Sequence, residues 1–179
     1  MQSSLHTIPF QQTGYFTSIV SDYLSGNAKL QPFYQHTPDI SGIRHAIESR
    51  KKSPVNRKLL QSTLLEQYAG LDLGEKLSRN IQLLSADNTF TITTAHQPNI
   101  FTGPLYFIYK CMHAIRLADF LQEQFPDYHF VPVYYMGAED ADLDEIGQVT
   151  VGGIQYVWKT TQTGAVGRDR KSTRLNSSH

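Results

Sequence analysis

Apolar residues in the first part of the chain recur with the 3.6-residue period of an α-helix. The first such run stops at Gly26, and Asp39 is placed to cap the next one. The same period returns over residues 59–68 and 75–84. Each of these helices is short and has a polar face. We therefore predict a helical segment over residues 1–88 that packs against the part of the chain that follows it.

The pattern changes at Asn88. Residues 90–95 (FTITTA) are rich in β-branched side chains, which favours a strand, and residues 130–136 (FVPVYYM) form a second apolar run. Pro132 in that run predicts a strand that begins late or lacks one ladder hydrogen bond. Between the two runs, an apolar stretch over 105–124 predicts a long helix. Strand, loop, helix and strand make a parallel βαβ unit, so the predicted fold class is α/β.

Two further patterns complete the predicted elements. The polar residues of the long helix recur at every third position, as Lys110, His113, Arg116, Asp119 and Gln122. This spacing predicts one narrow exposed stripe and burial of the remaining helix surface, including an inert thiol at Cys111. After the second strand, Gly152 and Gly153 separate two short β-prone runs, which predicts a tight hairpin.

Two polar segments are expected to lie together, because the carboxyl ends of parallel strands share the edge at which α/β proteins bind ligands. Their candidate residues are His96, Gln97, Asn99 and Thr102 after the first strand, and Glu139, Asp140, Asp142 and Asp144 after the second. The first loop opens a helix, whose free N–H groups favour an anion such as phosphate. His96 is a candidate phosphate ligand or general acid. The alternative is that His96 and Asn99 only satisfy backbone groups of the loop.

The acidic segment holds five carboxylates in seven residues. It is not an EF-hand, because Glu145 stands where that calcium loop needs glycine. Binding of a Mg²⁺–nucleotide through one or two of the carboxylates stays open. We interpret Asp142, Asp144 and Glu145 as a solvated helix start. Glu139 and Asp140 lie nearest to the strand end, and they are the candidate catalytic residues.

Other residues near this edge carry weaker signals. Lys110 is either a surface charge or a phosphate ligand, and the sequence has neither a P-loop signature nor a G-x-G-x-x-G fingerprint. We interpret two aromatic pairs, Tyr106 with Phe107 and Tyr134 with Tyr135, as core and sheet packing.

The composition fits a globular protein. Of the 179 residues, 40% are hydrophobic and 18% are charged, which excludes wholesale disorder. Sixteen basic and sixteen acidic residues give a formal net charge of zero, so no nucleic-acid partner is expected. No apolar run approaches the roughly 20 residues that a membrane helix needs, and the first residues lack the features of a signal peptide. The single cysteine makes a reducing cytoplasm the expected compartment.

The last eleven residues, 169–179 (DRKSTRLNSSH), have no apolar periodicity. They match the translation of a common sequencing adapter at every position, so we expect a non-native tail that does not pack. An ordinary polar tail is the alternative. The tail holds three basic residues and one acidic residue, which leaves 13 basic and 15 acidic residues. The natural protein is expected to continue past Arg168.

Two blocks of the sequence resemble a known family. Residues 95–115 (AHQPNIFTGPLYFIYKCMHAI) and 131–146 (VPVYYMGAEDADLDEI) are similar to the cysteine-adding enzymes of bacillithiol biosynthesis, BshC, as is GAVGR at 164–168. The resemblance implies a Rossmann-like core, of which residues 89–168 would be the first part, and a coiled coil beyond this chain. It also implies a ligase that attaches cysteine to the amine of glucosaminyl-malate. The fragment itself, truncated relative to the family, is expected to be inactive.

The resemblance does not cover every candidate residue. Family members often show E-D-H-D where this chain has Glu139, Asp140, Ala141 and Asp142, and T-G-Q-Q near His96, so no role is carried over to Ala141 or His96. The implied partners are small molecules, cysteine and glucosaminyl-malate, and a homodimer formed through the coiled coil. ATP and Mg²⁺ fit amide formation, but the residues leave the cofactor and any metal site open. The alternatives are another nucleotidyl-transferring or adenylate-forming enzyme of the same fold, or a non-catalytic nucleotide-binding or interaction module.

Overall fold

The computed structural model describes residues 6–141 and 143–161, and the chain divides into two compact units, Met1–Val55 and Asn56–His179. The first unit holds helices α1 (Phe10–Thr13), α2 (Ser18–Leu24), the 3-10 helix η1 (Ala28–Phe33) and α3 (Ile40–Lys51). As predicted, Asp39 caps α3, because its carboxylate accepts a hydrogen bond of 2.7 Å from the Gly42 N–H. This bond holds the pKa of Asp39 below its usual value.

The second unit begins with two more helices at predicted positions, α4 (Arg57–Gln67) and α5 (Glu75–Leu83). The Arg57 guanidinium donates hydrogen bonds to the carbonyls of Leu84, at 3.4 Å, and Thr89, at 3.0 Å. Only 22% of the Arg57 side chain is exposed, so water competes weakly for these bonds. The start of α4 is thereby tied to the start of the first strand.

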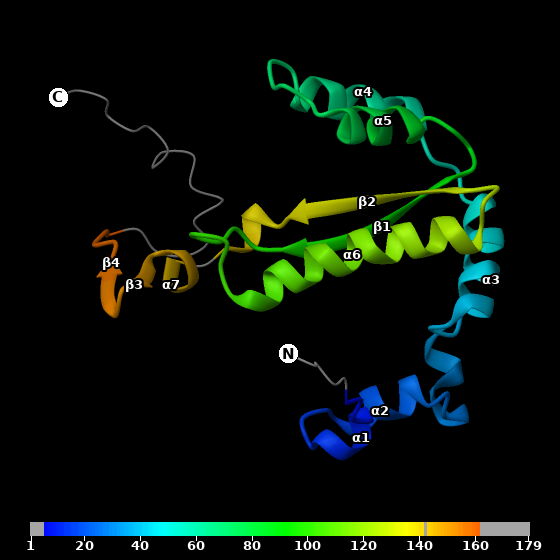
Figure 1. Ribbon diagram of the computed structural model, residues 1–179, viewed down its shortest axis with the longest axis horizontal. Helices are drawn as coiled ribbons and strands as arrows, with labels where there is room; N and C mark the ends of the chain where they lie inside the picture. Colours follow the sequence, from blue (N-terminus) through cyan, green and yellow to red (C-terminus); the bar gives the residue numbers. More distant parts are fainter. Residues whose placement is uncertain (1–5, 142, 162–179) are drawn as a thin grey trace, which may run out of the picture. The chain divides into compact units, whose positions relative to one another are not determined.

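The central feature of this unit is the predicted βαβ arrangement of β1 (Thr89–His96), α6 (Leu105–Gln124) and β2 (His129–Met136) (Figure 1). β1 and β2 pair in parallel and in register over all eight residues of each strand. Of the two alternatives predicted for Pro132, the late strand start is wrong, because Pro132 lies inside β2, opposite Ile92. The other alternative holds, because proline has no N–H to donate to the ladder. Each strand of a two-stranded sheet is an edge strand, and edge strands tolerate proline.

The core of the second unit lies where one face of α6 packs on the two strands. Its buried apolar residues include Ala114, Ala118 and Leu121 of α6, with Phe125, Phe130 and Val131. The spacing of the three helix residues places them on one side of α6. Thr89 is a buried polar residue, and its hydroxyl is satisfied by donating to the Leu83 carbonyl at 2.6 Å.

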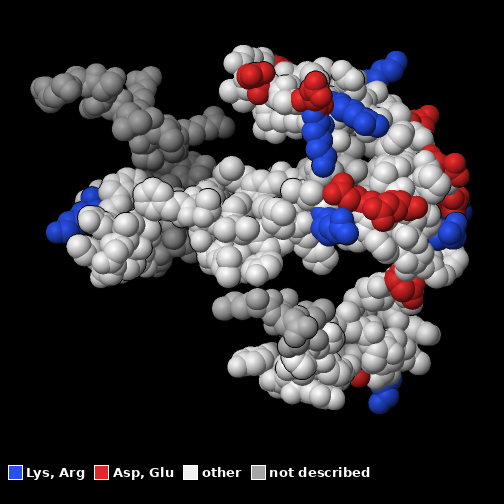
Figure 2. All heavy atoms as spheres, in the orientation of Figure 1, with Lys and Arg blue, Asp and Glu red and all other residues white. Residues whose placement is uncertain are grey.

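The opposite side of α6 is apolar as well, but exposed. Five residues form this apolar ridge, and between 37% and 67% of their surface is exposed: Leu105, Ile108, Tyr109, Met112 and Ile115. The prediction that everything outside one polar stripe is buried is therefore wrong, and Cys111 is only half-buried. The physical reason is that a two-stranded sheet covers one face of a helix. On the face seen in Figure 2, no Lys, Arg, Asp or Glu lies over the first half of α6.

After β2 the chain forms η2 (Ala138–Asp140), α7 (Leu143–Ile146), β3 (Gln148–Val151) and β4 (Ile154–Val157). β3 and β4 pair antiparallel, which confirms the predicted hairpin. Gly152 and Gly153 form its turn with φ values of 59° and 82°, a backbone that glycine adopts without strain. Among the described residues, no helix is both long and apolar enough to cross a membrane. The predicted tail at 169–179 and the GAVGR segment lie outside the described residues.

Candidate functional site

The carboxyl ends of β1 and β2 lie side by side, as predicted. His96 pairs with Met136, and the His96 carbonyl accepts hydrogen bonds from the Gly137 N–H, at 3.0 Å, and from the Tyr134 hydroxyl, at 3.2 Å. A carbonyl oxygen has two lone pairs, so both of its acceptor positions are used. The backbone is thus fixed at the point where β1 gives way to the loop, and both candidate segments leave from one edge of the sheet.

Three of the predicted loop residues form one polar cluster, which we call the His96 cluster. His96 Nδ1 lies 2.9 Å from the Gln97 carbonyl oxygen and 3.1 Å from Asn99 Nδ2. Asn99 Nδ2 also donates to the Gln97 carbonyl, at 3.2 Å. On its Nδ1 side, His96 therefore satisfies the loop, as the alternative interpretation described. On its Nε2 side, it contacts the Tyr106 hydroxyl at 2.9 Å.

The first turns of α6 send two polar groups back to the end of β1. The Tyr106 hydroxyl reaches His96, and Lys110 Nζ donates to the Ala95 carbonyl at 2.6 Å. Tyr106 and Lys110 are four residues apart, so they share one helix face, and helical side chains tilt toward the helix N-terminus. The interpretation of Tyr106 as a packing residue is therefore wrong, since 55% of it is exposed and its hydroxyl belongs to the site. This tilt is the sequence signal that could have placed Tyr106 there.

Phe107 and Tyr134 do pack as expected. The Phe107 ring stands edge-on to Tyr134, with centroids 5.5 Å apart, and to the His96 ring, at 5.6 Å. Burial raises the pKa of the Tyr134 phenol, and the nearby Cys111 thiol raises it further. The phenol therefore stays protonated over a wide pH range, and it keeps donating to the His96 carbonyl.

The rest of the loop has an unusual backbone. Phe101, Thr102 and Gly103 are three successive residues with positive φ, at 50°, 68° and 61°. Left-handed conformations cost a non-glycine residue on the order of 1–2 kcal/mol, so Phe101 and Thr102 are strained. The Thr102 hydroxyl donates to the Phe101 carbonyl, at 2.5 Å. Of the four predicted loop residues, Thr102 is the one that does not belong to the His96 cluster, since its hydroxyl bonds Phe101 instead.

The acidic segment places one described carboxylate beside the edge. Glu139 Oε1 accepts a hydrogen bond of 2.9 Å from the Tyr135 hydroxyl, and this bond and the negative charge of Glu139 raise the pKa of Tyr135. Tyr135 is exposed, so the interpretation of this residue as packing is wrong. The backbone of Asp140 lies in η2, while its side chain, with all of Asp142, is outside the described part.

Removing the Glu139 carboxylate is expected to lower the pKa of Tyr135. Glu139→Ala removes both the acceptor and the charge, which are the two largest causes, and should lower the pKa toward its usual value. Glu139→Gln keeps an acceptor and removes the charge, so it should lower the pKa only part of the way. Titration of ¹³C-labelled tyrosine rings by NMR, with Glu123→Gln on α6 as control, measures this. An unchanged Tyr135 pKa in Glu139→Ala would contradict the contact.

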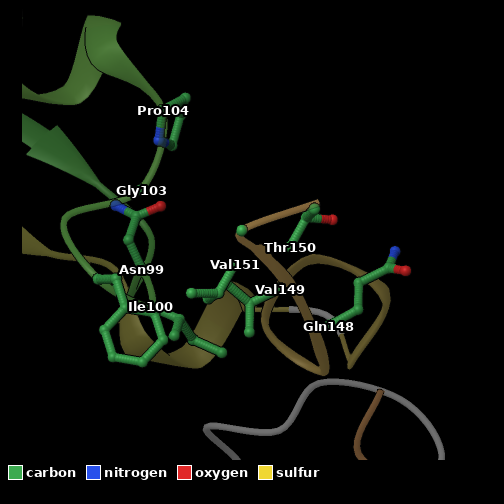
Figure 3. Close-up of a pocket in the computed structure, with 10 residues that line it drawn as sticks. Asn99, Ile100, Gly103, Pro104, Gln148, Val149, Thr150 and Val151 are labelled. Carbon is green, nitrogen blue, oxygen red and sulfur yellow. The ribbon is translucent and has the colours of Figure 1, made fainter. Parts of the chain in front are cut away.

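A pocket of about 630 Å³ lies between the loop and β3 (Figure 3). Asn99 belongs both to its wall and to the His96 cluster, and Ile100, Val149 and Val151 make its surface partly apolar. The β3 wall was not predicted, because no sequence pattern shows which later element approaches a given loop. Among the described side chains, no three His, Cys, Asp or Glu groups come together as a metal-ligand set.

The chain matches the family model described as "Bacillithiol biosynthesis BshC, N-terminal Rossmann-like domain" over residues 3–177. It is 44% identical over 165 residues to "Putative cysteine ligase BshC" of Cytophaga hutchinsonii. This match covers 92% of this chain and 32% of the relative. The protein of that name from Flavobacterium psychrophilum is 42% identical over 164 residues, 90% of this chain and 31% of the relative. The protein of that name from Bacillus thuringiensis is 28% identical over 142 residues, and this match covers 79% of this chain and 26% of the relative.

The chain thus spans about a third of the length of the first two of these curated relatives. The match to the family model extends over nearly all of the chain. The parallel strands, the long intervening helix and the polar groups at the strand ends match one βαβ unit of a Rossmann-like domain. The chain belongs to the BshC family, and its fold is that of the family's N-terminal Rossmann-like domain.

Proposed function

We propose that this chain supplies the N-terminal domain of a ligase that joins the carboxyl group of cysteine to the amine of glucosaminyl-malate. One observation carries the proposal: the His96 cluster and Glu139 leave from the same carboxyl edge of two parallel strands. This is the edge at which α/β proteins bind their ligands. The relatives are named cysteine ligases, and bacillithiol biosynthesis is part of the family's description, which supports this substrate class.

The loop residues are proposed to bind the polar groups of the substrates. Glucosaminyl-malate carries sugar hydroxyls and two carboxylates, which amide and imidazole groups such as those of Gln97, Asn99 and His96 bind by hydrogen bonds. Thr102 adds a hydroxyl at the exposed part of the loop. Lys110 supplies a positive charge at the end of β1, where it would attract a carboxylate or a phosphate.

Glu139 and Asp140 are proposed to hold the reacting amine. An ammonium group is attracted by carboxylates, and the Tyr135 hydroxyl fixes one oxygen of Glu139. A fixed carboxylate orients the amine without the entropy cost of ordering a mobile side chain. Both residues are hydrogen-bond acceptors when ionised, so they would hold the amine in place while the bond to cysteine forms.

A nucleotide such as ATP fits the start of α6. Within the described residues, the N–H groups of Leu105 and Tyr106 have no acceptor, and Pro104 makes no side-chain cap. Such N–H groups, at the positive end of the helix dipole, bind phosphate. ATP, when bound, would activate the cysteine carboxyl group. Glu139 is a single described carboxylate at this edge, so we assign no metal ligands.

The test is to delete the parental gene from its host and to measure bacillithiol by mass spectrometry. We expect the thiol to disappear and to return with the full-length gene, but not with a gene for the 179-residue chain alone. The chain alone should fail because its apolar ridge is exposed and because it covers 32% of a relative's length. Glu139→Gln and Asp140→Asn in the full-length protein should lower bacillithiol, whereas Glu123→Gln should not. Undiminished thiol after deletion, with no second gene copy, would overturn the proposal.

A further inference from the structure

We propose that Tyr106 and His96 form a proton relay that takes up the proton lost by the attacking amine. This inference rests on the proposed ligase function and adds to it a residue that neither the family resemblance nor the sequence pattern assigned. The relay consists of the Tyr106 hydroxyl on the substrate side and the His96 imidazole behind it, joined by the 2.9 Å contact between Tyr106 Oη and His96 Nε2.

The placement of the two rings suits a relay in which the substrate meets Tyr106 before His96. The Tyr106 side chain is exposed at the carboxyl edge of the sheet, where substrate is proposed to bind. The imidazole is half-buried, and its ring centroid lies 5.2 Å from Tyr106 and 5.6 Å from Phe107. Packing against Phe107 limits rotation of the imidazole, so Nε2 stays directed at the hydroxyl. A substrate amine would therefore meet Tyr106 first and His96 only through it.

The contacts of Nδ1 allow His96 to change its protonation state without moving. When Nδ1 carries the proton, it donates to the Gln97 carbonyl, and Nε2 accepts from Tyr106. When Nε2 carries the proton, it donates to Tyr106, and Nδ1 accepts from Asn99 Nδ2. In the imidazolium both nitrogens donate, to Gln97 and to Tyr106. Each state has a partner at both nitrogens, so a proton can arrive without reorganising the loop.

The chemical step balances as follows. The amine nitrogen of glucosaminyl-malate bonds to the carbonyl carbon of a cysteine carboxyl group that is activated as a mixed anhydride with phosphate. The bond from that carbon to the phosphate-class leaving group breaks, and the leaving group takes its electron pair. The proton lost by the amine passes to the Tyr106 oxygen while the Tyr106 proton passes to His96 Nε2. The imidazolium later returns its proton to solvent through Tyr106.

The test uses the full-length protein and compares Tyr106→Phe with Tyr109→Phe. Both changes remove one phenolic oxygen from an exposed tyrosine of α6, but Tyr109 belongs to the apolar ridge and not to the relay. Formation of the amide from cysteine and glucosaminyl-malate is followed by mass spectrometry. Loss of a general acid–base group costs about 10²–10⁴-fold, so we expect kcat to fall about 10²-fold in Tyr106→Phe, with KM changed by less than about threefold. Tyr109→Phe should match the wild type.

A structural readout complements the kinetics. In protein labelled with ¹⁵N-histidine, the His96 signals are assigned by their loss in His96→Gln. Tyr106→Phe is expected to shift Nε2 more than Nδ1, because only Nε2 loses its partner, and Tyr109→Phe should shift neither. The relay would be overturned by any of three results: an unchanged ¹⁵N signal of His96 Nε2 in Tyr106→Phe, equal kcat values in Tyr106→Phe and Tyr109→Phe, or an effect of Tyr106→Phe on KM alone. Wild-type protein that forms no amide would overturn the proposed function and the relay with it.

Discussion

Leu121→Ala is expected to lower the free energy of unfolding by about 2–5 kcal/mol, the range for removing a leucine side chain from a packed core. Leu121 is 1% exposed and lies on the face of α6 that packs on the two strands. The small residues Ala114 and Ala118 beside it bring the helix close to the sheet, so the space left by the lost methyl groups cannot be refilled by longer neighbours. Chemical denaturation followed by circular dichroism measures the change.

Leu105→Ala is the matched control, since Leu105 lies on the same helix and is 65% exposed. It should change the free energy of unfolding by less than about 0.5–1 kcal/mol, because exposed positions bury little apolar surface. Equal destabilisation by the two substitutions would contradict the core described for α6. A smaller effect at Leu121 than at Leu105 would show that the apolar ridge, and not the sheet-facing side, is the buried one.

The longer elements of this chain and its hairpin were predictable because each carries a local signal, whereas α1 and η1 were not predicted. β-branched residues mark β1, Asp39 marks the start of α3, and two glycines mark the hairpin turn. The shared edge of β1 and β2 followed from topology alone, since a helical crossover makes the two strands parallel. Gly137 and Tyr134 converge on the His96 carbonyl at that edge, which shows that the two segments meet there.

What the sequence did not predict depends on which groups meet in the folded chain. Periodicity shows that a helix surface is apolar, but not whether another element covers it, so the apolar ridge was expected to be buried. The roles of Tyr106 and Tyr135 were missed for a related reason. A tyrosine has an apolar ring and a polar hydroxyl, and only the position of a partner, His96 or Glu139, decides which of the two matters.

Gly103→Ala is expected to lower the activity of the full-length protein by about 10²-fold, the cost of displacing a positioned group by about 1 Å. Gly103 has a φ of 61°, which disfavours alanine. A Cβ there would also lie 2.5 Å from Cγ and 2.6 Å from Oδ1 of Asn99, closer than van der Waals contact allows. Asn99 would have to move, and it bonds both His96 and the Gln97 carbonyl. The substitution therefore acts on the His96 cluster through its packing.

Gly70→Ala is the control that separates the clash with Asn99 from the free-energy cost of placing alanine at a positive φ. Gly70 has a φ of 84°, but nothing lies within 4 Å of a Cβ built on it, and it lies between α4 and α5, outside the site. Both variants should lose about 1 kcal/mol of stability from the left-handed backbone. Only Gly103→Ala should lose activity and shift the His96 Nδ1 signal, because Asn99 contacts that nitrogen. Equal activity in the two variants would show that Asn99 does not need its present position, and it would remove the loop from the proposed site.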